Sequence, residues 1–377
     1  MEKERLINTM DYTFTFDDHI QSPEISVNQY LRSKCLDLSK AVNAKKIVYL
    51  DTKFWLIVRD VALGRSTTDG SEDFYHEIVK LSSEGRFIFP ISEEVFLEIT
   101  KQTDPDTLRQ TVDLIDILSS GVSLINFEER LTLEIKHFLR SMSGASVYKC
   151  QEMVWTKLAY NMGFVTPSNQ YIDPDMDKAI QKAFIDQMWI ITLSDIISFL
   201  SEDAELCIPS MPKLSGKLNK GKFDHSHENN SFKKMFLSEL YGSLDAYREV
   251  ITTCLMDINE ADIGNTLTEK ESSDLEKQLS NAIYHLFRLN KSKYFFPTFD
   301  VISGLHAAIR WDKNQKYQDN DIHDINHAAS ALPYCDAFFT DKRLAHLITQ
   351  KATSYDRKYS CKVASSVSES LNALQNL

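Results

Sequence analysis

Polar and apolar positions follow two repeating patterns in the first third of the chain. Short apolar runs alternate with longer stretches in which apolar residues recur every three or four positions. Such runs are typical of buried strands, and the three-to-four spacing is typical of helices. The runs lie at 45–51, 86–90 and 122–125, and the helical spacing lies at 54–62, 73–83, 92–98 and 104–118. The alternation predicts an α/β fold with a central parallel sheet and crossover helices.

The same alternation returns near residue 296. Its clearest elements are a helix that begins at Asn320 or Asp321, an apolar run at 337–340, a strand at 360–364 and a helix at 367–374. Between 127 and 295 the spacing is helical, and a polar stretch at 207–231 contains several lysines. We therefore expect an N-terminal helical extension (1–44) and one α/β domain in two parts (45–126 and 296–377), interrupted by an all-helical insertion (127–295).

Composition excludes several classes of protein. The chain is 43% hydrophobic, which is enough for a sizeable core, and its sequence begins without the apolar stretch of a signal peptide. It contains no uncharged apolar run of about 18 residues, so we expect no membrane span. Six scattered cysteines without a Cys-x-x-Cys pair are typical of a reduced, cytoplasmic protein without structural zinc. The net charge of −12 argues against a surface that is positive throughout, although a local basic groove remains compatible with it.

Acidic residues stand where the predicted strands end. Asp51 closes the first apolar run, and Asp341 follows the run at 337–340. Asp324 lies in the first turn of a helix rich in small residues, where a negative charge suits the helix dipole. Ligands of open α/β sheets bind at the carboxyl ends of the strands. Asp324 and Asp341 could therefore face one pocket.

Four short motifs carry these carboxylates in a fixed order. They are Tyr49-Leu50-Asp51-Thr52, then Ile91-Ser92-Glu93-Glu94-Val95-Phe96-Leu97-Glu98, then Asp324-Ile325-Asn326-His327-Ala328-Ala329-Ser330-Ala331, and last Phe338-Phe339-Thr340-Asp341. In this combination the chain resembles the PIN-domain nucleases, including the toxin ribonucleases of bacterial toxin–antitoxin pairs. The resemblance covers 45–126 and 296–377 and does not extend over 127–295.

The resemblance implies a PIN-like three-layer fold, in which helices flank a central parallel sheet. It implies that Asp51, Glu98, Asp324 and Asp341 bind Mg²⁺ or Mn²⁺ and catalyse hydrolysis of a phosphodiester bond, of RNA rather than DNA, leaving 5′-phosphate and 3′-hydroxyl ends. The chemistry supports this independently, because carboxylates hold the hard divalent cations that neutralise a phosphate and activate water. Two carboxylates about 4 Å apart repel by roughly 4 kcal/mol at an effective dielectric constant of about 20, so a cluster of four needs a cation or protons.

Further residues near the motifs have both a functional and a structural interpretation. Thr52 and Thr340 could bond a carboxylate or a phosphate, or complete a turn; Glu94 competes with Glu98 for the acidic role; and Asp321 is a helix cap or an auxiliary metal contact. Lys53 stands where the family commonly has Asn, so its ammonium could fill part of the metal site or contact a phosphate. Four lysines of the polar stretch could contact nucleic-acid phosphates or belong to a solvated loop: Lys213, Lys217, Lys220 and Lys222.

Other enzyme classes lack their motifs in this sequence. No Asp-x-Asp of haloacid-dehalogenase-like phosphatases follows the first strand, no GxxxxGK[ST] of P-loop enzymes is present, and no GxGxxG of dinucleotide folds follows a strand. We expect a divalent-metal-dependent endonuclease, with a regulatory or inhibitory protein partner. The alternative is a catalytically weak PIN-like scaffold that binds RNA or protein, in which Lys53 marks decay of the metal site. Dimerisation is left open.

Overall fold

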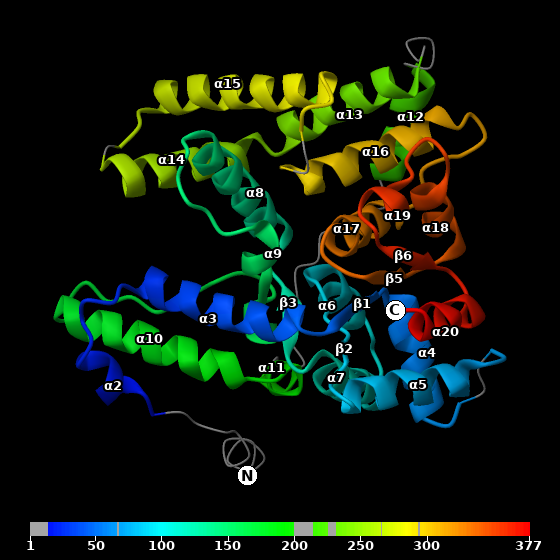
Figure 1. Ribbon diagram of the computed structural model, residues 1–377, viewed down its shortest axis with the longest axis horizontal. Helices are drawn as coiled ribbons and strands as arrows, with labels where there is room; N and C mark the ends of the chain where they lie inside the picture. The colour runs from blue at the N-terminus through cyan, green and yellow to red at the C-terminus, as the bar shows by residue number, and fades with distance from the viewer. Residues whose placement is uncertain (1–13, 66–67, 200–213, 225–230, 265, 293–294) are drawn as a thin grey trace. The chain divides into compact units, whose positions relative to one another are not determined.

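The chain is a mixed α/β protein that is mostly helical and has few, short strands (Figure 1). The computed structural model describes residues 14–65, 68–199, 214–224, 231–264, 266–292 and 295–377. The chain divides into two compact units. The first consists of Met1–Asn126, Gln151–Ile208 and Ser366–Leu377, and the second of Phe127–Cys150 and Pro209–Ser365. None of the described helices is long and apolar enough to cross a lipid bilayer.

A parallel strand pair and its crossover helices form the part of the first unit that the sequence predicts best. β1 (Lys46–Leu50) pairs in parallel with β2 (Phe87–Ile88), and Lys46 lies opposite Phe87. β1 is buried from Ile47 onward, as expected for an apolar run inside a sheet. The helices of this region are α4 (Thr52–Ala62), α5 (Ser71–Ser83), α6 (Glu93–Ile99) and α7 (Pro105–Ser119). The predicted alternation at 45–118 is confirmed.

The next strand corrects two expectations. β3 (Val122–Leu124) pairs antiparallel with β4 (Trp155–Lys157), whereas the sequence predicted a further strand of the parallel sheet. Its link to the preceding motif is a single parallel bridge between Ile91 and Ser123. β4 also shows that the segment 127–295 is not all-helical. A strand of three residues is too short to display an alternating pattern, so β4 could not be recognised from periodicity.

Three helices of the first unit are joined by one buried carboxylate. α2 (Phe16–Ile20), α3 (Val27–Asn43) and α10 (Pro174–Ile190) pack together (Figure 1). Asp186 of α10 accepts hydrogen bonds from Thr15 (2.7 Å), His19 (2.8 Å) and Tyr30 (2.5 Å), and Lys34 forms an ion pair with it at 2.6 Å. Burial opposes ionisation of Asp186, but these bonds outweigh it and lower the pKa of the carboxyl to about 2.

One turn earlier on α10, Lys182 is almost fully buried. Its ammonium donates to the backbone carbonyls of Ser22 (2.8 Å), Ile25 (3.3 Å) and His19 (3.5 Å), which lie in and after α2. A lysine ammonium has three N–H donors, and here three carbonyl groups accept them.

The remaining elements of the first unit are α9 (Cys150–Met153, of which Cys150 belongs to the second unit), η1 (Leu158–Tyr160), α11 (Leu193–Phe199) and α20 (Val367–Gln375).

Among its described residues, the second unit is a helical assembly with one parallel strand pair. β5 (Ala337–Phe339) pairs with β6 (Lys362–Ala364), and Phe338 lies opposite Val363. The helices are α8 (Phe127–Met142), α12 (Leu214–Asp224), α13 (Phe232–Ala246), α14 (Arg248–Ile263), α15 (Glu269–Arg288), α16 (Pro297–Trp311), α17 (Asp321–Ala331), α18 (Lys342–Thr349) and α19 (Tyr355–Lys358). Apolar side chains of α8, α13, α14, α15 and the start of α16 form its helical core.

α16 is fixed at its beginning by a buried acid. Glu134 of α8 accepts hydrogen bonds from the backbone N–H of Thr298 (3.2 Å), the Thr298 hydroxyl (2.6 Å) and the Tyr334 hydroxyl (3.0 Å). Burial raises the pKa of Glu134 to about 8, although these donors and the charge of Arg130 favour the ionised form. The fold therefore holds a carboxyl that changes its charge near neutral pH.

Close packing also fixes the middle of α16. The Tyr355 hydroxyl donates to the backbone carbonyl of Asp300 at 2.6 Å, and it reaches that carbonyl across Gly304. A β-carbon at Gly304 would overlap the hydroxyl and the ring of Tyr355. Glycine at this position is thus required by close approach, since no positive φ angle is involved.

Candidate functional site

Asp51 lies directly after β1, as the sequence predicts for the first carboxylate. It is buried and occupies the N-cap position of α4, where its Oδ1 accepts from the backbone N–H of Phe54 at 3.3 Å. An aspartate in this position satisfies one of the unpaired N–H groups of the first helical turn. The carboxyl end of β1 is therefore held by the residue that is predicted to bind metal.

Thr52 connects this strand end to the second motif. Its hydroxyl donates a hydrogen bond to Oε2 of Glu98, a half-buried residue of α6 that lies 46 positions further along the chain. Two predicted acidic residues, Asp51 and Glu98, are thereby brought into one neighbourhood. Between them in sequence, Lys53 is exposed, and its ammonium lies 5.3 Å from the centroid of the Phe54 ring.

Ser92 has a different role from the one that its sequence position suggests. It occupies the N-cap position of α6, but its side chain makes no capping hydrogen bond. Instead the Ser92 hydroxyl lies 2.5 Å from the Tyr49 hydroxyl, and both side chains are fully buried. This contact ties the beginning of α6 to β1 and so helps position Glu98. Glu94, the competing acid of this motif, is buried, whereas Glu98 is half-buried.

Asp341 is the corresponding residue of the second unit. It follows β5 and caps α18, with its Oδ1 accepting from the backbone N–H of Arg343 (2.5 Å) and of Leu344 (3.0 Å). Both capping bonds use the same carboxylate oxygen. The prediction that a strand ends in Thr340 and Asp341 and a new helix begins there is confirmed.

Arg343 is a residue that the sequence reasoning missed. Its guanidinium donates to both oxygens of Asp321, from Nε at 2.9 Å and from Nη2 at 2.9 Å, while its backbone N–H donates to Oδ1 of the capping residue Asp341. Asp321 is buried and also accepts from the backbone N–H of Gln318 at 2.8 Å. The available signal was the basic pair that follows Thr340-Asp341 in the sequence. Any metal at Asp321 would compete with this arginine.

The start of α17 differs in detail from the expected cap. Asn320 occupies the N-cap position without a side-chain bond, and Asp321 is the first helical residue. Asp324 lies in the first turn, half-buried, and its backbone N–H donates to the carbonyl of Asn320 at 3.0 Å. It has the helical position that the sequence predicts.

Thr340 adds an unusual polar atom beside Asp341. The residue is fully buried, and among the residues that the structure describes its hydroxyl has no hydrogen-bond partner. A buried hydroxyl without a partner costs about 1–3 kcal/mol. Such a group fits a place where a ligand or a water molecule completes the hydrogen bonding.

The described residues contain no group of three or more His, Cys, Asp or Glu side chains that could hold a metal ion. The donor chemistry of the predicted residues nevertheless fits Mg²⁺ or Mn²⁺, because carboxylates are the ligands these ions prefer. Within the first unit the structure brings Asp51 and Glu98 together through Thr52, and within the second it connects Asp321 with Asp341 through Arg343.

The lysines that were predicted to contact nucleic acid fall into three groups. Lys213 lies outside the described residues, and Lys217 and Lys220 are exposed on α12. Lys222 donates to the backbone carbonyls at the end of α16 and just beyond it, those of Ile309 (2.7 Å), Asp312 (2.5 Å) and Gln315 (2.5 Å). Partial burial lowers the pKa of its ammonium. A phosphate contact from Lys222 would require these bonds to break.

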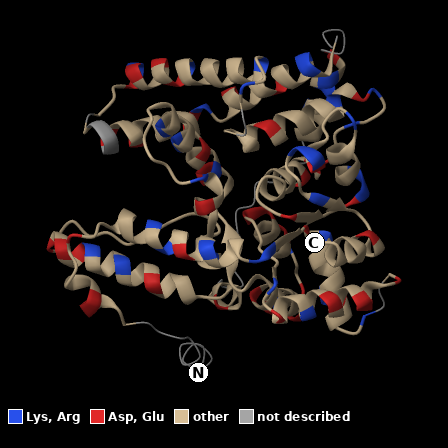
Figure 2. Cartoon of the chain, viewed as in Figure 1, with Lys and Arg blue, Asp and Glu red and all other residues tan. Residues whose placement is uncertain are grey.

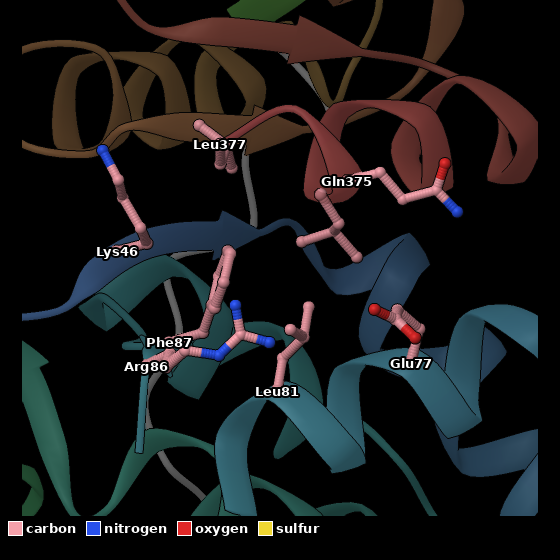
Figure 3. Close-up of a pocket in the computed structure, with 8 residues that line it drawn as sticks. Lys46, Glu77, Leu81, Arg86, Phe87, Gln375 and Leu377 are labelled. Atoms are coloured by element: carbon pink, nitrogen blue, oxygen red, sulfur yellow. The ribbon is translucent and has the colours of Figure 1, made fainter. Parts of the chain in front are cut away.

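A separate cavity of about 470 Å³ lies in the first unit (Figure 3). Lys46 and Arg86 with Phe87 line it from the beginnings of β1 and β2, and further lining residues come from α5 and the C-terminal segment: Glu77, Leu81, Leu374, Gln375 and Leu377. Asp51 follows the opposite end of β1, so this cavity is not part of the carboxylate site.

Comparison of the chain with family models, with curated proteins and with solved structures gives no match.

Proposed function

We propose that the chain is a divalent-metal-dependent endonuclease of the PIN-like type, which hydrolyses phosphodiester bonds of RNA. The observation that carries the proposal is the hydrogen bond from Thr52 to Glu98. Sequence motifs predict an acid at a strand end and another on a helix, but they do not require the two to meet. The contact supports a common role for Asp51 and Glu98.

The residues of the first unit have properties that suit this chemistry. Asp51 caps α4 through Oδ1, and an aspartate can cap a helix through one oxygen while the other binds a cation. Thr52 orients Glu98, as partners of metal-binding carboxylates commonly do. A bound Mg²⁺ or Mn²⁺ would supply charge neutralisation for the phosphate and an activated water. Lys53, exposed beside Asp51, would contact a neighbouring phosphate.

For the second unit, the proposal rests on the resemblance of its two motifs to those of PIN-domain nucleases. It predicts Asp324 and Asp341 as metal-binding carboxylates of this unit, and the buried hydroxyl of Thr340 supports a bound group near Asp341. The choice of RNA over DNA rests on the same resemblance. So does the expectation of an inhibitory protein partner.

The decisive experiment is cleavage of a mixed single-stranded RNA pool with Mn²⁺ or Mg²⁺ by the wild type, Asp51→Asn and Asp324→Asn. Asparagine caps helices as well as aspartate does, so Asp51→Asn removes charge without removing the α4 cap. Asp104→Asn is the matched control, because Asp104 caps α7 in the same way, outside the predicted site. We expect both site variants to lose on the order of 100-fold or more in rate and the control to cut like the wild type.

A scaffold without strong catalysis is the second candidate. The bidentate contact of Arg343 with Asp321 favours it, because an internal cation already neutralises one acidic residue beside Asp341. Thermal unfolding with and without Mn²⁺ separates the two candidates, since a ligand that binds only the folded state raises stability. No cutting and no Mn²⁺-induced shift would favour the scaffold. A shift that Asp51→Asn abolishes, without cutting, would indicate a working metal site tested on the wrong nucleic acid.

A further inference from the structure

A second cavity lies in the second unit, at one end of α13. Its volume is about 400 Å³, within the usual range for small-ligand sites. It is lined by Phe232, Lys233 and Phe236 from α13, by Phe287 from α15, by Asn290 and Ser292, by Asp300 from α16 and by Lys358 from α19. The combination of three phenylalanines with two lysines distinguishes it from the cavity in the first unit, which has one aromatic side chain.

The aromatic side of the cavity is ordered by ring contacts. The rings of Phe236 and Phe287 lie 5.5 Å apart between centroids, at an angle of 49°. Phe232 stands edge-on to Trp311 at 6.4 Å. Phe287 is buried, whereas Phe232 and Phe236 are half-buried and line the cavity from one helix face. Partly exposed rings beside a cavity suit a flat, aromatic ligand.

The polar side is equally well fixed. Asp300 accepts hydrogen bonds from Lys358 (2.5 Å) and from the Tyr359 hydroxyl (2.6 Å), and both bonds use Oδ2. Lys233 donates to the side-chain oxygen of Asn290 at 3.1 Å. The cavity therefore presents a buried acceptor at Asp300 and an exposed ammonium at Lys233.

The surrounding charge extends this cationic side. Lys and Arg, blue in Figure 2, gather along α12 and the beginning of α13. The described residues between 214 and 236 include five lysines and one aspartate, although the whole chain carries a net charge of −12. A local positive stretch in an acidic chain attracts a polyanion to one place.

We propose that this cavity binds one nucleotide of single-stranded RNA, with its base against Phe232 and Phe236 and its phosphate at Lys233. Stacking on aromatic side chains and ionic contacts to phosphates are the two main sources of affinity for single strands. Asp300 accepts a hydrogen bond from an amino group of the base. The inference rests on the proposed function, because it assigns the RNA substrate an anchoring site on α13 that none of the acidic motifs contains.

The test measures binding without cleavage. A fluorescently labelled single-stranded RNA of mixed sequence is titrated with the full chain in EDTA, and anisotropy reports the dissociation constant at several salt concentrations. We expect Lys233→Gln to weaken binding several-fold and to lower the salt slope by about one. Phe236→Leu is expected to weaken binding about tenfold. Thermal unfolding verifies that each variant is folded.

Two control variants match these changes. Lys234→Gln removes the same charge from the next residue of α13, which does not line the cavity, and Phe223→Leu removes an exposed ring of α12. Both are expected to weaken binding clearly less than Lys233→Gln and Phe236→Leu do. Equal weakening by Lys233→Gln and Lys234→Gln, or unchanged binding by Phe236→Leu, would overturn the proposal.

An abasic strand separates stacking from charge. The wild type should bind it about tenfold more weakly than the RNA, and Phe236→Leu should show a smaller difference between the two strands because only the Phe232 ring remains for the base. A wild type that binds both strands equally would contradict a base in the cavity. Because binding is measured in EDTA, without the divalent ion, the outcome at the cavity is independent of whether the carboxylates cleave RNA.

Discussion

The hydroxyl of Thr52 donates a hydrogen bond to Glu98, and this contact joins the end of β1 to α6. It links two acidic motifs that are distant in sequence. Its partner contact is the buried hydroxyl pair of Tyr49 and Ser92, at 2.5 Å. Together they fix α6 against β1 at two points, one structural and one within the candidate site.

Replacing Thr52 by valine tests this contact, because valine keeps the shape of the side chain and removes the donor. If Glu98 binds or orients the metal-bound water, Thr52→Val should lower the apparent affinity for Mn²⁺ by about 10–100-fold. Thr52→Ser keeps the hydroxyl and should stay close to the wild type. The measurement is the Mn²⁺ dependence of RNA cleavage and of the unfolding temperature. An identical response of all three proteins would remove Thr52 from the site.

The two glycines of α16 and α13 should respond to alanine in opposite directions. Gly304→Ala places a methyl group on the hydroxyl of Tyr355, which is held by the Asp300 carbonyl, so we expect a loss of roughly 2–4 kcal/mol in unfolding free energy. Gly242 is exposed on α13 and has open space around its Cα. Gly242→Ala should therefore stabilise the protein by about 0.5–1 kcal/mol. Chemical denaturation of both variants gives the comparison, and a neutral Gly304→Ala would show that Tyr355 moves readily.

The buried acid of α8 should make stability depend on pH. The pKa of Glu134 is about 8 in the folded chain and has the ordinary glutamate value of 4.5 when the chain unfolds. Between these values the folded state keeps a proton that the unfolded state releases, so the unfolding free energy falls as pH rises through this window. The slope from this one group is at most about 1.4 kcal/mol per pH unit. Glu134→Gln should remove that contribution, measured by denaturation from pH 5 to pH 9.

Glu249→Gln provides the control for this slope, since it removes an exposed carboxylate of α14. Its stability should change with pH as that of the wild type does. A Glu134→Gln variant with an unaltered slope would mean that the pH dependence arises elsewhere.

The contribution of Asp186 to the unfolding free energy should depend on pH in the opposite direction, increasing as pH rises. Its pKa is lowered to about 2, so its contribution is present above the usual value near 3.8 and is lost as pH falls towards 2. Asp186→Asn leaves Lys34 without its counter-ion, and we expect a loss of about 2–4 kcal/mol at pH 7. Asp175→Asn on the same helix changes an exposed acid that pairs with Lys178, and it should cost less than about 1 kcal/mol. Similar losses from the two variants at pH 7 would argue against a special role of Asp186.

The elements with strong local signals were predictable from the sequence. β1 and β5 are apolar runs that end in Asp51 and Asp341, and α4 and α18 begin at these residues because a short acid caps a helix. The conformation at both strand ends is local, so a sequence pattern specifies it. The interrupted domain at 45–126 and 296–377, with its insertion, stays a prediction.

What the sequence did not reveal depends on tertiary contacts. The pairing of β4 with β3 joins residues more than 30 positions apart, and its three residues carry no alternation. Ser92 stands at the N-cap position of α6, but its hydroxyl lies beside the buried Tyr49 hydroxyl and makes no capping bond. Arg343 was missed because only the fold brings its guanidinium to Asp321.

The hydrogen bonds of Lys182 and Lys222 should change the chemical reactivity of these two side chains. Each ammonium donates to three backbone carbonyls, in the first and in the second unit respectively, and so closes a helix end from outside. An ammonium held in this way is not a nucleophile, because its nitrogen has no lone pair and its hydrogens are engaged in hydrogen bonds. Brief acetylation followed by peptide mass spectrometry should modify the exposed Lys217 and Lys220 early. Lys182 and Lys222 should react only as their helices unfold, which makes them internal reporters of local opening.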